Sequence, residues 1–541
     1  MVDPVHFVDA RGQTRLVRAD PRQTLAHVLF LEGLWPTRPF CAGLGRCGHC
    51  VVYFDHAPPE PLPAETAALS SAVLSSGGRL ACRRVAEPGL RIALPFSFPA
   101  SIIETEKLSL PRSTQGPLSL AMDLGTTSIH WLAGDQTGKL AGGREFNPQL
   151  VAGSEVMSRL AFALADPGNG GVLRDIVLRR LQALVRAFPE PVERACIAGN
   201  TVMTALLLDW PLAGLASAPY RLPHPGGIWT TIHLPDGSGL QTYIPPLPAP
   251  FIGADVSAGL AALHFSQASP PAYPWLFADL GTNGEFVLAL GPEQYLAASV
   301  PMGPALEGIG MARGSAALPG VWVDVTLTAR GLQPRILTES ATVVGSAAII
   351  PPKPDQSEPM TGQRISGTGY LSLLAVLRRL GLLDEAGGFV AGQNPLARRV
   401  GLELRQDEGE TRFMLGPDVF LTGRDVEEVL KVKAAFNLAF SRLLEAGGIA
   451  PDALRAVYLA GALGEHVDLS ALEELGFVPL GSKQRIKPLG NTSLAGARLL
   501  ATEQRARDWI EQAVPRVTTL DIGQEKNFFT NYIQRLVFRY V

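Results

Sequence analysis

The chain has 541 residues, 46% of them hydrophobic and 18% charged, and its formal net charge is −3. This length is too great for one ordinary hydrophobic core and predicts two to four domains, while the composition excludes a disordered chain. The small net charge, without a run of Lys or Arg, argues against nucleic acid as a partner.

Targeting and redox features of the sequence favour the cytoplasm. The opening stretch MVDPVHFVDARGQTR lacks the basic and apolar regions of a secretory signal. No apolar run approaches the ~18 residues that a membrane span requires, so we expect no membrane partner. Five cysteines are too few for a disulfide framework, and free thiolates suit a reducing compartment. We therefore expect a cytoplasmic protein.

The first elements in chain order predict a small sheet with one helix. Two strand patterns, VHFVDA and TRLVRAD, flank a turn at 11–13 and predict a hairpin. An apolar stripe in RQTLAHVLFLEG predicts a helix. Further strands are predicted at 51–54, 79–85 and 90–94.

Three of the five cysteines lie in the glycine-rich stretch CAGLGRCGHC, residues 41–50. With the cysteine that follows, they give the spacing C-x5-C-x2-C-x31-C through Cys41, Cys47, Cys50 and Cys82. Glycines let such a loop wrap two irons closely and bring backbone N–H groups against the sulfurs. A four-cysteine zinc site is the alternative, but zinc sites favour two short C-x2-4-C pairs. We therefore predict a 2Fe–2S cluster in a β-grasp ferredoxin domain over 1–97, with the fifth cysteine, Cys196, in a core strand.

Residues 98–117 carry prolines without a helical period and are predicted to be a linker. The pattern then changes to a strand, a glycine turn and a second strand in SLAMDLGTTSIHWLAGD, residues 119–135. A similar phrase, WLFADLGTNGEFVLAL, occupies 275–290. This DLGT repeat predicts two equivalent hairpins within a second domain over 118–541.

Each DLGT hairpin has the residues of a phosphate-binding turn. The glycines Gly125 and Gly281 leave room for an anion, and donors beside them come from Thr126, Thr127, Thr282 and Asn283. Asp123 and Asp279 stand where a carboxylate can hold the water shell of Mg²⁺. Glu285 either orders an attacking water or is an outward strand residue. The pair of turns favours a nucleotide clamp, and no P-loop or dinucleotide fingerprint competes with it.

The two phrases resemble the phosphate-1 and phosphate-2 motifs of the superfamily of actin, the heat-shock chaperone ATPases and the sugar kinases. VYLAGALGEHVD, residues 457–468, is similar to its adenosine motif, with Gly461 and Gly464 beside the nucleoside. The resemblance implies a multidomain α+β and α/β protein: the ferredoxin, then a two-lobed actin-like (ribonuclease-H-like) ATPase with lobes at roughly 118–270 and 271–541.

A helix with a capping box at Thr422 and Asp425 precedes the adenosine motif and is predicted to end at Gly447. Lys433 within it faces the nucleotide lobe if the resemblance holds, and is otherwise a solvated helix lysine. Asp255 reads equally well as a metal-facing carboxylate and as the start of a helix.

A ferredoxin followed by this ATPase resembles the reductive activators of corrinoid proteins over nearly the whole chain. The resemblance includes NPQLVAGSEVMSRL (147–160), AGNTVMTALLL (198–208) and GNTSLAGA (490–497). The sequence departs from the family pattern at Met302 and Ala462, where alanine and glycine are expected, and at the SGTG turn of 366–369.

This resemblance implies an ATP-hydrolysing electron-transfer enzyme with a 2Fe–2S cluster, ATP and Mg²⁺. The cluster would pass one electron to a corrinoid protein of a methyltransferase system, reducing Co(II) to Co(I), and an upstream low-potential donor would reload it. A homodimer is also implied. The alternatives are a redox-sensing ATP-binding protein and a small-molecule kinase with an appended ferredoxin domain.

Overall fold

The computed structural model describes most of the chain. Its residues are 3–19, 23–32, 34, 43, 45, 48, 50–96, 117–135, 138–153, 155–188, 190–266, 269–308, 311–315, 317, 320–328, 331–337, 349–350, 364–390, 403–407, 410–415, 419–461 and 467–541. Cys41, Cys47, Gly464, Ala462 and nearly all of the predicted linker lie outside this set. None of the helices within it is both long and apolar enough to cross a membrane.

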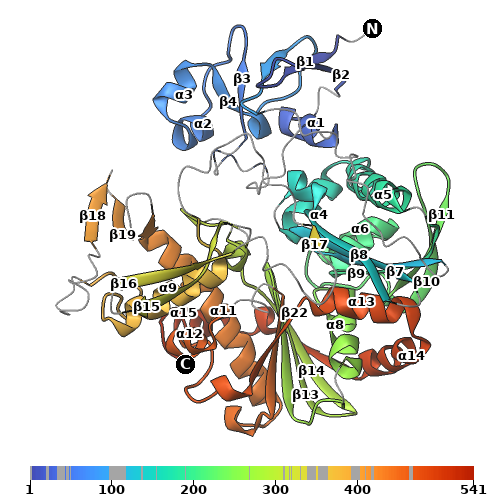
Figure 1. The fold of residues 1–541 in the computed structure, drawn as a ribbon, viewed down its shortest axis with the longest axis vertical. Coiled ribbons are helices and arrows are strands. Elements are labelled where there is room, and N and C mark those ends of the chain that lie inside the picture. The colour runs from blue at the N-terminus through green and yellow to red at the C-terminus, as the bar shows by residue number, and fades with distance from the viewer. Residues whose placement is uncertain are drawn as a thin grey trace.

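The N-terminal part is a five-stranded mixed sheet in the order β2-β1-β5-β3-β4, covered by short helices (Figure 1). Its elements are β1 (Val5–Val8), β2 (Thr14–Val17), α1 (Leu25–Leu31), β3 (Val51–Phe54), α2 (Pro63–Ala68), α3 (Ser71–Ser75), β4 (Gly78–Leu80), the 3₁₀ turn η1 (Ala81–Arg83) and β5 (Arg91–Ala93). β1 pairs with β2 antiparallel and with β5 parallel. The predicted hairpin, helix and strand at 51–54 are confirmed, and the ferredoxin identity stays a prediction.

The strand predicted at 79–85 is wrong beyond its first residues. β4 ends at Leu80, and Ala81–Arg83 form a 3₁₀ turn that contains Cys82. The apolar run there reflects burial of Leu80 and Ala81 in the core and not continued pairing with β3.

The next part is built on a seven-stranded sheet in the order β10-β11-β9-β6-β7-β8-β17. Its elements are β6 (Leu118–Leu124), β7 (Ser128–Asp135), β8 (Gly138–Phe146), η2 (Pro148–Ala152), α4 (Val156–Ala165), α5 (Asn169–Ala187), β9 (Val192–Gly199), α6 (Thr201–Leu208), α7 (Ala213–Ala216), β10 (Ile228–His233), β11 (Gly239–Ile244), α8 (Ala254–Phe265) and the distant β17 (Ile349–Ile350). Helices α4, α5 and α6 bury one face of the sheet.

The C-terminal part is built on a six-stranded sheet in the order β22-β21-β12-β13-β14-β23. Its elements are β12 (Trp275–Leu280), β13 (Asn283–Gly291), β14 (Gln294–Pro301), η3 (Pro304–Glu307), α9 (Gly367–Arg379), α11 (Gly423–Ala446), η5 (Pro451–Ala453), β21 (Ala456–Gly461), α12 (Leu469–Glu474), η6 (Lys483–Arg485), β22 (Ile486–Gly490), α13 (Thr492–Thr502), α14 (Gln504–Ala513), η7 (Val514–Arg516), β23 (Val517–Leu520), η8 (Ile522–Gln524) and α15 (Phe528–Ile533).

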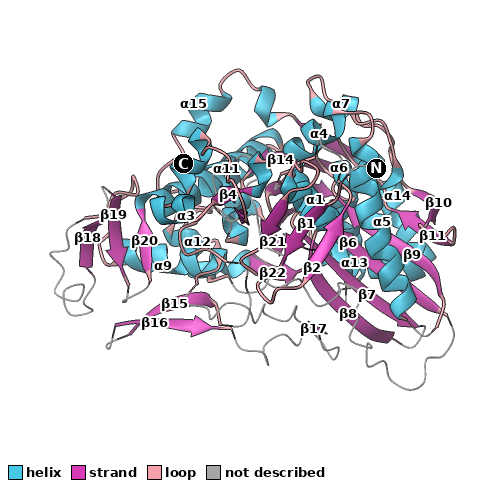
Figure 2. Cartoon of the chain, turned by 90° about the horizontal axis from the view of Figure 1, so that it is seen from above, coloured by secondary structure: helices cyan, strands magenta, loops and turns pink. Residues whose placement is uncertain are grey.

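Two small sheets lie on the side of the six-stranded sheet away from the seven-stranded one (Figures 1 and 2). They are formed by β15 (Trp322–Thr328) with β16 (Gly331–Ile336), and by β18 (Glu403–Asp407), β19 (Glu410–Met414) and β20 (Phe420–Thr422). The capping box of Thr422 and Asp425 starts α11, and Gly447 caps its end, as predicted.

Helices α8 and α13 cross at the junction of the two large sheets. Gly259 of α8 lies against Phe277 and Thr492, where an added Cβ would come within 2.8 Å and 2.9 Å of side-chain atoms. A Cβ on Gly496 of α13 would lie 1.7 Å from the Ala258 carbonyl oxygen. Glycine therefore sets how closely the helices, and the sheets that carry them, approach one another.

Candidate nucleotide site between the two sheets

The first DLGT phrase forms the turn between β6 and β7. Asp123 pairs with His130 and Leu124 with Ile129, so Gly125 to Thr127 close the hairpin. A Cβ on Gly125 would lie 2.7 Å from the carbonyl oxygen of Ser128, which explains glycine at this position.

Buried polar side chains hold this turn through hydrogen bonds to its carbonyl oxygens. Asn147 donates from Nδ2 to the Gly125 carbonyl oxygen at 2.8 Å, and Arg159 donates to the carbonyl oxygen of Thr126. Asn200 caps α6 by accepting from the Met203 N–H, and its Nδ2 also donates to Thr126 Oγ1 at 2.8 Å. Asn200 therefore both caps α6 and contacts the first turn.

The second DLGT phrase forms the matching turn between β12 and β13. Asp279 pairs with Glu285 across the ladder, and Leu280 pairs with Gly284. The Gly281 N–H donates to the Asn283 carbonyl oxygen at 2.9 Å, and the N–H groups of Met302 and Gly303 both donate to the carbonyl oxygen of Thr282. Met302, the departure from the family pattern, is therefore a buried support of this turn.

Both turns line one cavity of ≈ 240 Å³. The cavity brings together all the predicted turn residues, namely Asp123, Gly125, Thr126, Thr127, Asp279, Gly281, Thr282, Asn283 and Glu285, with Gly461. Sequence reasoning assigned no role here to His130, Arg144, Thr368, Asn491 and Ser493, which line it as well. Asp255 stands in the first turn of α8, as predicted, and also lines the cavity, so its metal-facing role stays a prediction.

Asp123 is tied to the start of α13. Its two carboxylate oxygens accept hydrogen bonds from Asn491 Nδ2 at 2.7 Å and Ser493 Oγ at 2.9 Å. His130 Nδ1 lies 3.5 Å from the same carboxylate. The GNTSLAGA segment thus reaches across the junction to the first turn.

Three acidic side chains converge on the other wall of the cavity. Burial, reinforced by the charges of Asp255 and Asp123, raises the pKa of Asp279 to about 8. Burial and the charge of Asp123 raise the pKa of Asp255 to about 7. The pKa of Glu285 is raised in the same way by burial and by the two aspartates. No ion pair to these three side chains is formed within the described part of the chain, so this wall favours a cation.

The donor set fits a hydrated Mg²⁺ with a polyphosphate. Mg²⁺ prefers one or two carboxylates, with waters and phosphates for the rest, and the two turns supply that arrangement. Thr127 Oγ1 is buried in the cavity wall with no hydrogen-bond partner among the residues of known position, as expected of a donor reserved for a ligand.

Gly461, which is predicted to flank the adenosine, lies against Asp279 of the second turn. Its φ is +71°, and a Cβ there would lie 2.5 Å from Asp279 Oδ1. Its predicted companion Gly464 lies outside the described part of the chain. Contact with adenosine therefore stays a prediction for both glycines.

Lys433 is not solvated, so the expectation of a solvated helix lysine is wrong, and it is not among the residues that line the cavity. It is fully buried in α11, and its Nζ donates to the carbonyl oxygens of Arg535, at 3.2 Å, and Arg539. Burial and the nearby arginines lower its pKa to about 7. The lysine therefore anchors the C-terminal segment. Cys196 is in the core of β9, as predicted, and burial raises the pKa of its thiol.

In the N-terminal part, two of the predicted iron ligands, Cys50 and Cys82, lie close together. The Sγ atoms of Cys50 and Cys82 lie 3.3 Å apart, too far for a disulfide but close enough to share one metal ion. The Ala81 N–H donates to the Cys50 carbonyl oxygen at 2.8 Å, which fixes the two segments. Cys41 and Cys47 lie outside the described residues. Among the described residues, no three His, Cys, Asp or Glu side chains are placed to bind one metal ion directly, so a Mg²⁺ at the acidic wall of the cavity would be held mainly through water and phosphate.

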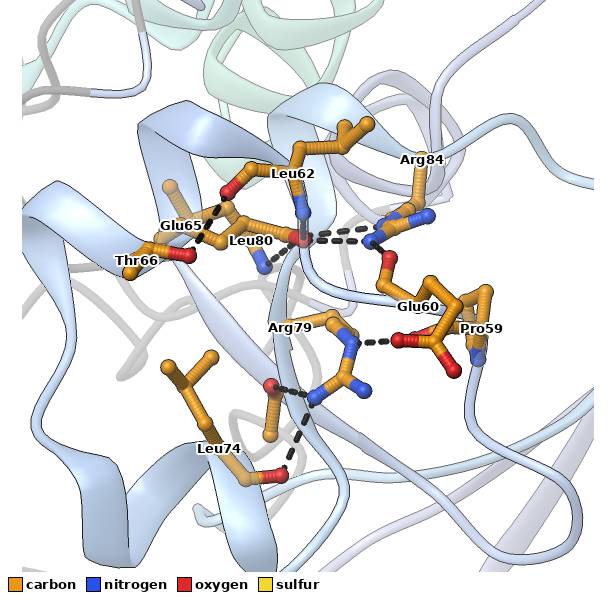
Figure 3. A network of polar contacts seen from close by, with 10 residues as sticks. Pro59, Glu60, Leu62, Glu65, Thr66, Leu74, Arg79, Leu80 and Arg84 are labelled. Carbon is orange, nitrogen blue, oxygen red and sulfur yellow. Dashed lines mark hydrogen bonds and ion pairs between the residues drawn. The ribbon is translucent and has the colours of Figure 1, made fainter.

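The buried Glu65 holds the Cys82 segment from both sides (Figure 3). Its carboxylate accepts from the Leu80 N–H at 2.9 Å, from the Leu62 N–H at 2.8 Å and from the Arg84 guanidinium. Cys82 therefore stands between two residues fixed by one carboxylate. The described cysteine pair fits a thiolate-bound metal, and the two-iron cluster stays a prediction.

Comparison with known proteins agrees with this architecture. Residues 118–268 match the RACo middle region, and residues 274–540 match the C-terminal domain of RACo, the ASKHA domain. The solved structure of a reductive activator for a corrinoid, iron-sulfur protein matches over 99% of this chain and 98% of its own, with a TM-score of 0.65 and 20% identity, so it shares the fold.

Two curated relatives are similar in sequence. The corrinoid activation enzyme RamQ of Eubacterium limosum is 28% identical over 77% of this chain and 70% of its own. The [Co(II) methylated amine-specific corrinoid protein] reductase of Methanosarcina barkeri is 27% identical over 68% of this chain and 66% of its own. With both RACo regions matched in order, the chain belongs to the family of reductive activators of corrinoid proteins.

Proposed function

We propose that this protein reduces the cobalt of a partner corrinoid protein from Co(II) to Co(I) in an ATP-dependent, one-electron step. The observation that carries the proposal is the presence, in one chain of this family, of a cysteine pair set for a metal and a carboxylate-walled cavity between two phosphate-type turns. The cysteines serve electron transfer and the cavity serves the nucleotide.

In the nucleotide cavity, Asp123 and Asp279 hold a hydrated Mg²⁺, and Glu285 orients the attacking water. Phosphates are bound by backbone N–H groups and side chains at Gly125, Thr126, Thr127, Gly281, Thr282 and Asn283. The cluster of unneutralised carboxylates supports this assignment, because a divalent cation removes their mutual repulsion.

In the N-terminal domain, Cys41, Cys47, Cys50 and Cys82 hold a 2Fe–2S cluster, which supplies one-electron chemistry when bound. Protein purified without oxygen should contain two irons and two sulfides per chain. Cys82→Ala should lose them, and the matched variant Cys196→Ala should keep them because that cysteine is a core residue. Stoichiometric zinc in a colourless protein would contradict this part.

ATP is needed because reduction of low-potential cobalt is uphill from an ordinary ferredoxin. For one electron, each ~60 mV uphill costs about 1.4 kcal/mol. ATP contributes this energy if the complex with the corrinoid protein exists in two conformations that differ in nucleotide affinity. An upstream low-potential donor in the cytoplasm reloads the cysteine site, and the active form is a homodimer.

The test mixes the protein, a candidate corrinoid protein held as Co(II) and a chemical reductant, with or without Mg·ATP, and follows the cobalt absorbance. We expect Co(I) to form with ATP and at least about tenfold more slowly without it or with Asp279→Ala. The corrinoid protein should also raise ATP turnover. Equal rates with and without ATP would reject the coupling and favour the redox-sensing alternative.

A further inference from the structure

The N-terminal domain contacts the seven-stranded part through one face of α1. The His27 ring packs edge-on against Phe162 of α4, with ring centroids 5.0 Å apart. Phe30 of α1 belongs to the apolar clusters of both parts. Helix α1 also contacts η2. We call the contact of α1 with η2 and α4 the seam.

On the side of the seven-stranded sheet, the seam is built from the elements that hold the first phosphate turn. Asn147 caps η2 and donates to the Gly125 carbonyl oxygen. Arg159 of α4 is fully buried, donates to the Thr126 carbonyl oxygen, and joins η2 through Gln149 Oε1 at 3.2 Å. A shift of the turn cannot leave η2 and α4 in place without breaking these buried hydrogen bonds.

The other side of the seam is joined to a cysteine. The Leu25 N–H, at the start of α1, donates to the Arg84 carbonyl oxygen at 2.8 Å, and the Ala86 N–H donates to the Gln23 carbonyl oxygen at the same distance. Arg84, which lies two residues after Cys82, donates a hydrogen bond to the Glu65 carboxylate. The segment before α1 and the Cys82 segment therefore move as one unit.

We propose that the seam couples the nucleotide site to the cysteine site. Nucleotide at the first turn shifts η2 and α4, and α1 passes the shift to the segment that holds Cys82. The inference rests on the proposed function and deepens it, since it names the contact through which ATP acts on the redox domain. It also assigns a role to NPQLVAGSEVMSRL, because Asn147, Gln149 and Arg159 come from that stretch.

Coupling of this kind is reciprocal. If nucleotide changes the state of the cysteine segment, then the state of that segment changes nucleotide affinity by the same factor. We expect a factor of about five or more, the lower end of common coupling factors. Phe162→Ala removes the ring contact of the seam without touching the cavity, and His27→Ala removes the same contact from the α1 side.

The test is hydrogen–deuterium exchange of the full chain, with and without a non-hydrolysable ATP analogue and Mg²⁺. In the wild type we expect the analogue to slow exchange at the first turn, residues 120–128, and to change exchange about fivefold in α1 and in residues 78–86. In Phe162→Ala and in His27→Ala, the response at 120–128 should remain and the responses in α1 and 78–86 should fall to less than twofold.

The matched control is Leu164→Ala, which removes an exposed apolar side chain from the same helix and should behave as wild type. A response at 120–128 with none at 78–86 in the wild type overturns the seam and leaves the proposed function standing. An unchanged distant response in both seam variants also overturns it. No response at 120–128 rejects the nucleotide site itself, and the seam with it.

Discussion

The two DLGT turns share a sequence and a hairpin but not an electrostatic setting. In the first, the Asp123 carboxylate accepts two hydrogen bonds from the start of α13 and lies beside His130. In the second, Asp279 stands opposite Glu285 and near Asp255, and its pKa is raised to about 8. The same DLGT sequence thus places Asp123 among hydrogen-bond donors and Asp279 among other carboxyl groups.

This difference indicates a division of labour across the cavity. The carboxyl groups at the second turn have no ion pair in the described residues and gain most from a cation. The first turn is already hydrogen-bonded to the start of α13. The DLGT repeat defines the geometry of each turn. The residues around each turn define the charge state of its aspartate.

The largest expected effect comes from Asp279. Replacing it with alanine should weaken Mg·ATP binding by about 100-fold, or about 2.7 kcal/mol, because the cation loses the central member of the acidic wall. Calorimetry gives the affinity, and circular dichroism checks that the chain remains folded. Unchanged affinity would place the nucleotide elsewhere.

The pH dependence should reveal the same wall. Asp279 and Asp255 bind protons until the pH passes about 8 and about 7, and Mg·ATP must displace them. Affinity should therefore rise well over tenfold from pH 6 to pH 8, with proton release measurable by calorimetry in two buffers. Asp279→Asn should flatten the rise, and a wild-type affinity independent of pH would contradict this view.

The same shift predicts the stability of the nucleotide-free protein. A carboxyl group with a raised pKa contributes stability that is fully present below its ordinary value of 3.8 and is lost as the pH rises through about 8. Asp279→Asn should therefore raise the melting temperature at pH 8 and change it little at pH 5. A destabilising effect at pH 8 would show that the charged carboxylate is satisfied in the folded state.

A more moderate effect is expected at the first turn. Asp123→Asn should weaken Mg·ATP binding by about tenfold, because this carboxylate already shares its oxygens with two donors. Asn491→Ala should cost about threefold, as a single hydrogen bond does. A loss at Asp123 as large as that at Asp279 would remove the asymmetry.

The smallest effect concerns Thr127. Its hydroxyl has no partner in the described structure, so Thr127→Val should leave the stability of the nucleotide-free protein unchanged and weaken ATP binding by about twofold. Thermal melting and calorimetry on the same sample separate the two quantities. Loss of stability without loss of affinity would make the hydroxyl a structural one.

The parts of this molecule that were predictable are those encoded by short stretches. The DLGT repeat located both turns because a strand, a glycine and a donor fix a hairpin locally, and the capping box of Thr422 located the start of α11. The spacing of Cys50 and Cys82 likewise anticipated two thiols that lie 3.3 Å apart.

What was missed depends on contacts between distant segments. Asn491 and Ser493 reach Asp123 only because α13 crosses the junction of the sheets, and no local pattern marks such a contact. Lys433 has a helical lysine's sequence context, yet the C-terminal segment covers it. Cys82 was placed in a strand because burial of its neighbours resembles strand patterning, although the backbone turns there.

The central claim, that both turns hold one nucleotide, is tested most directly by a double-mutant cycle for Mg·ATP binding. Calorimetry on the wild type, Asp123→Asn, Asp279→Asn and the double variant gives one coupling energy. We predict one nucleotide per chain and a coupling of about 1 kcal/mol or more, since both carboxylates act on the same cation. Losses that add to within about 0.5 kcal/mol would show that the two turns act independently and would contradict a shared site.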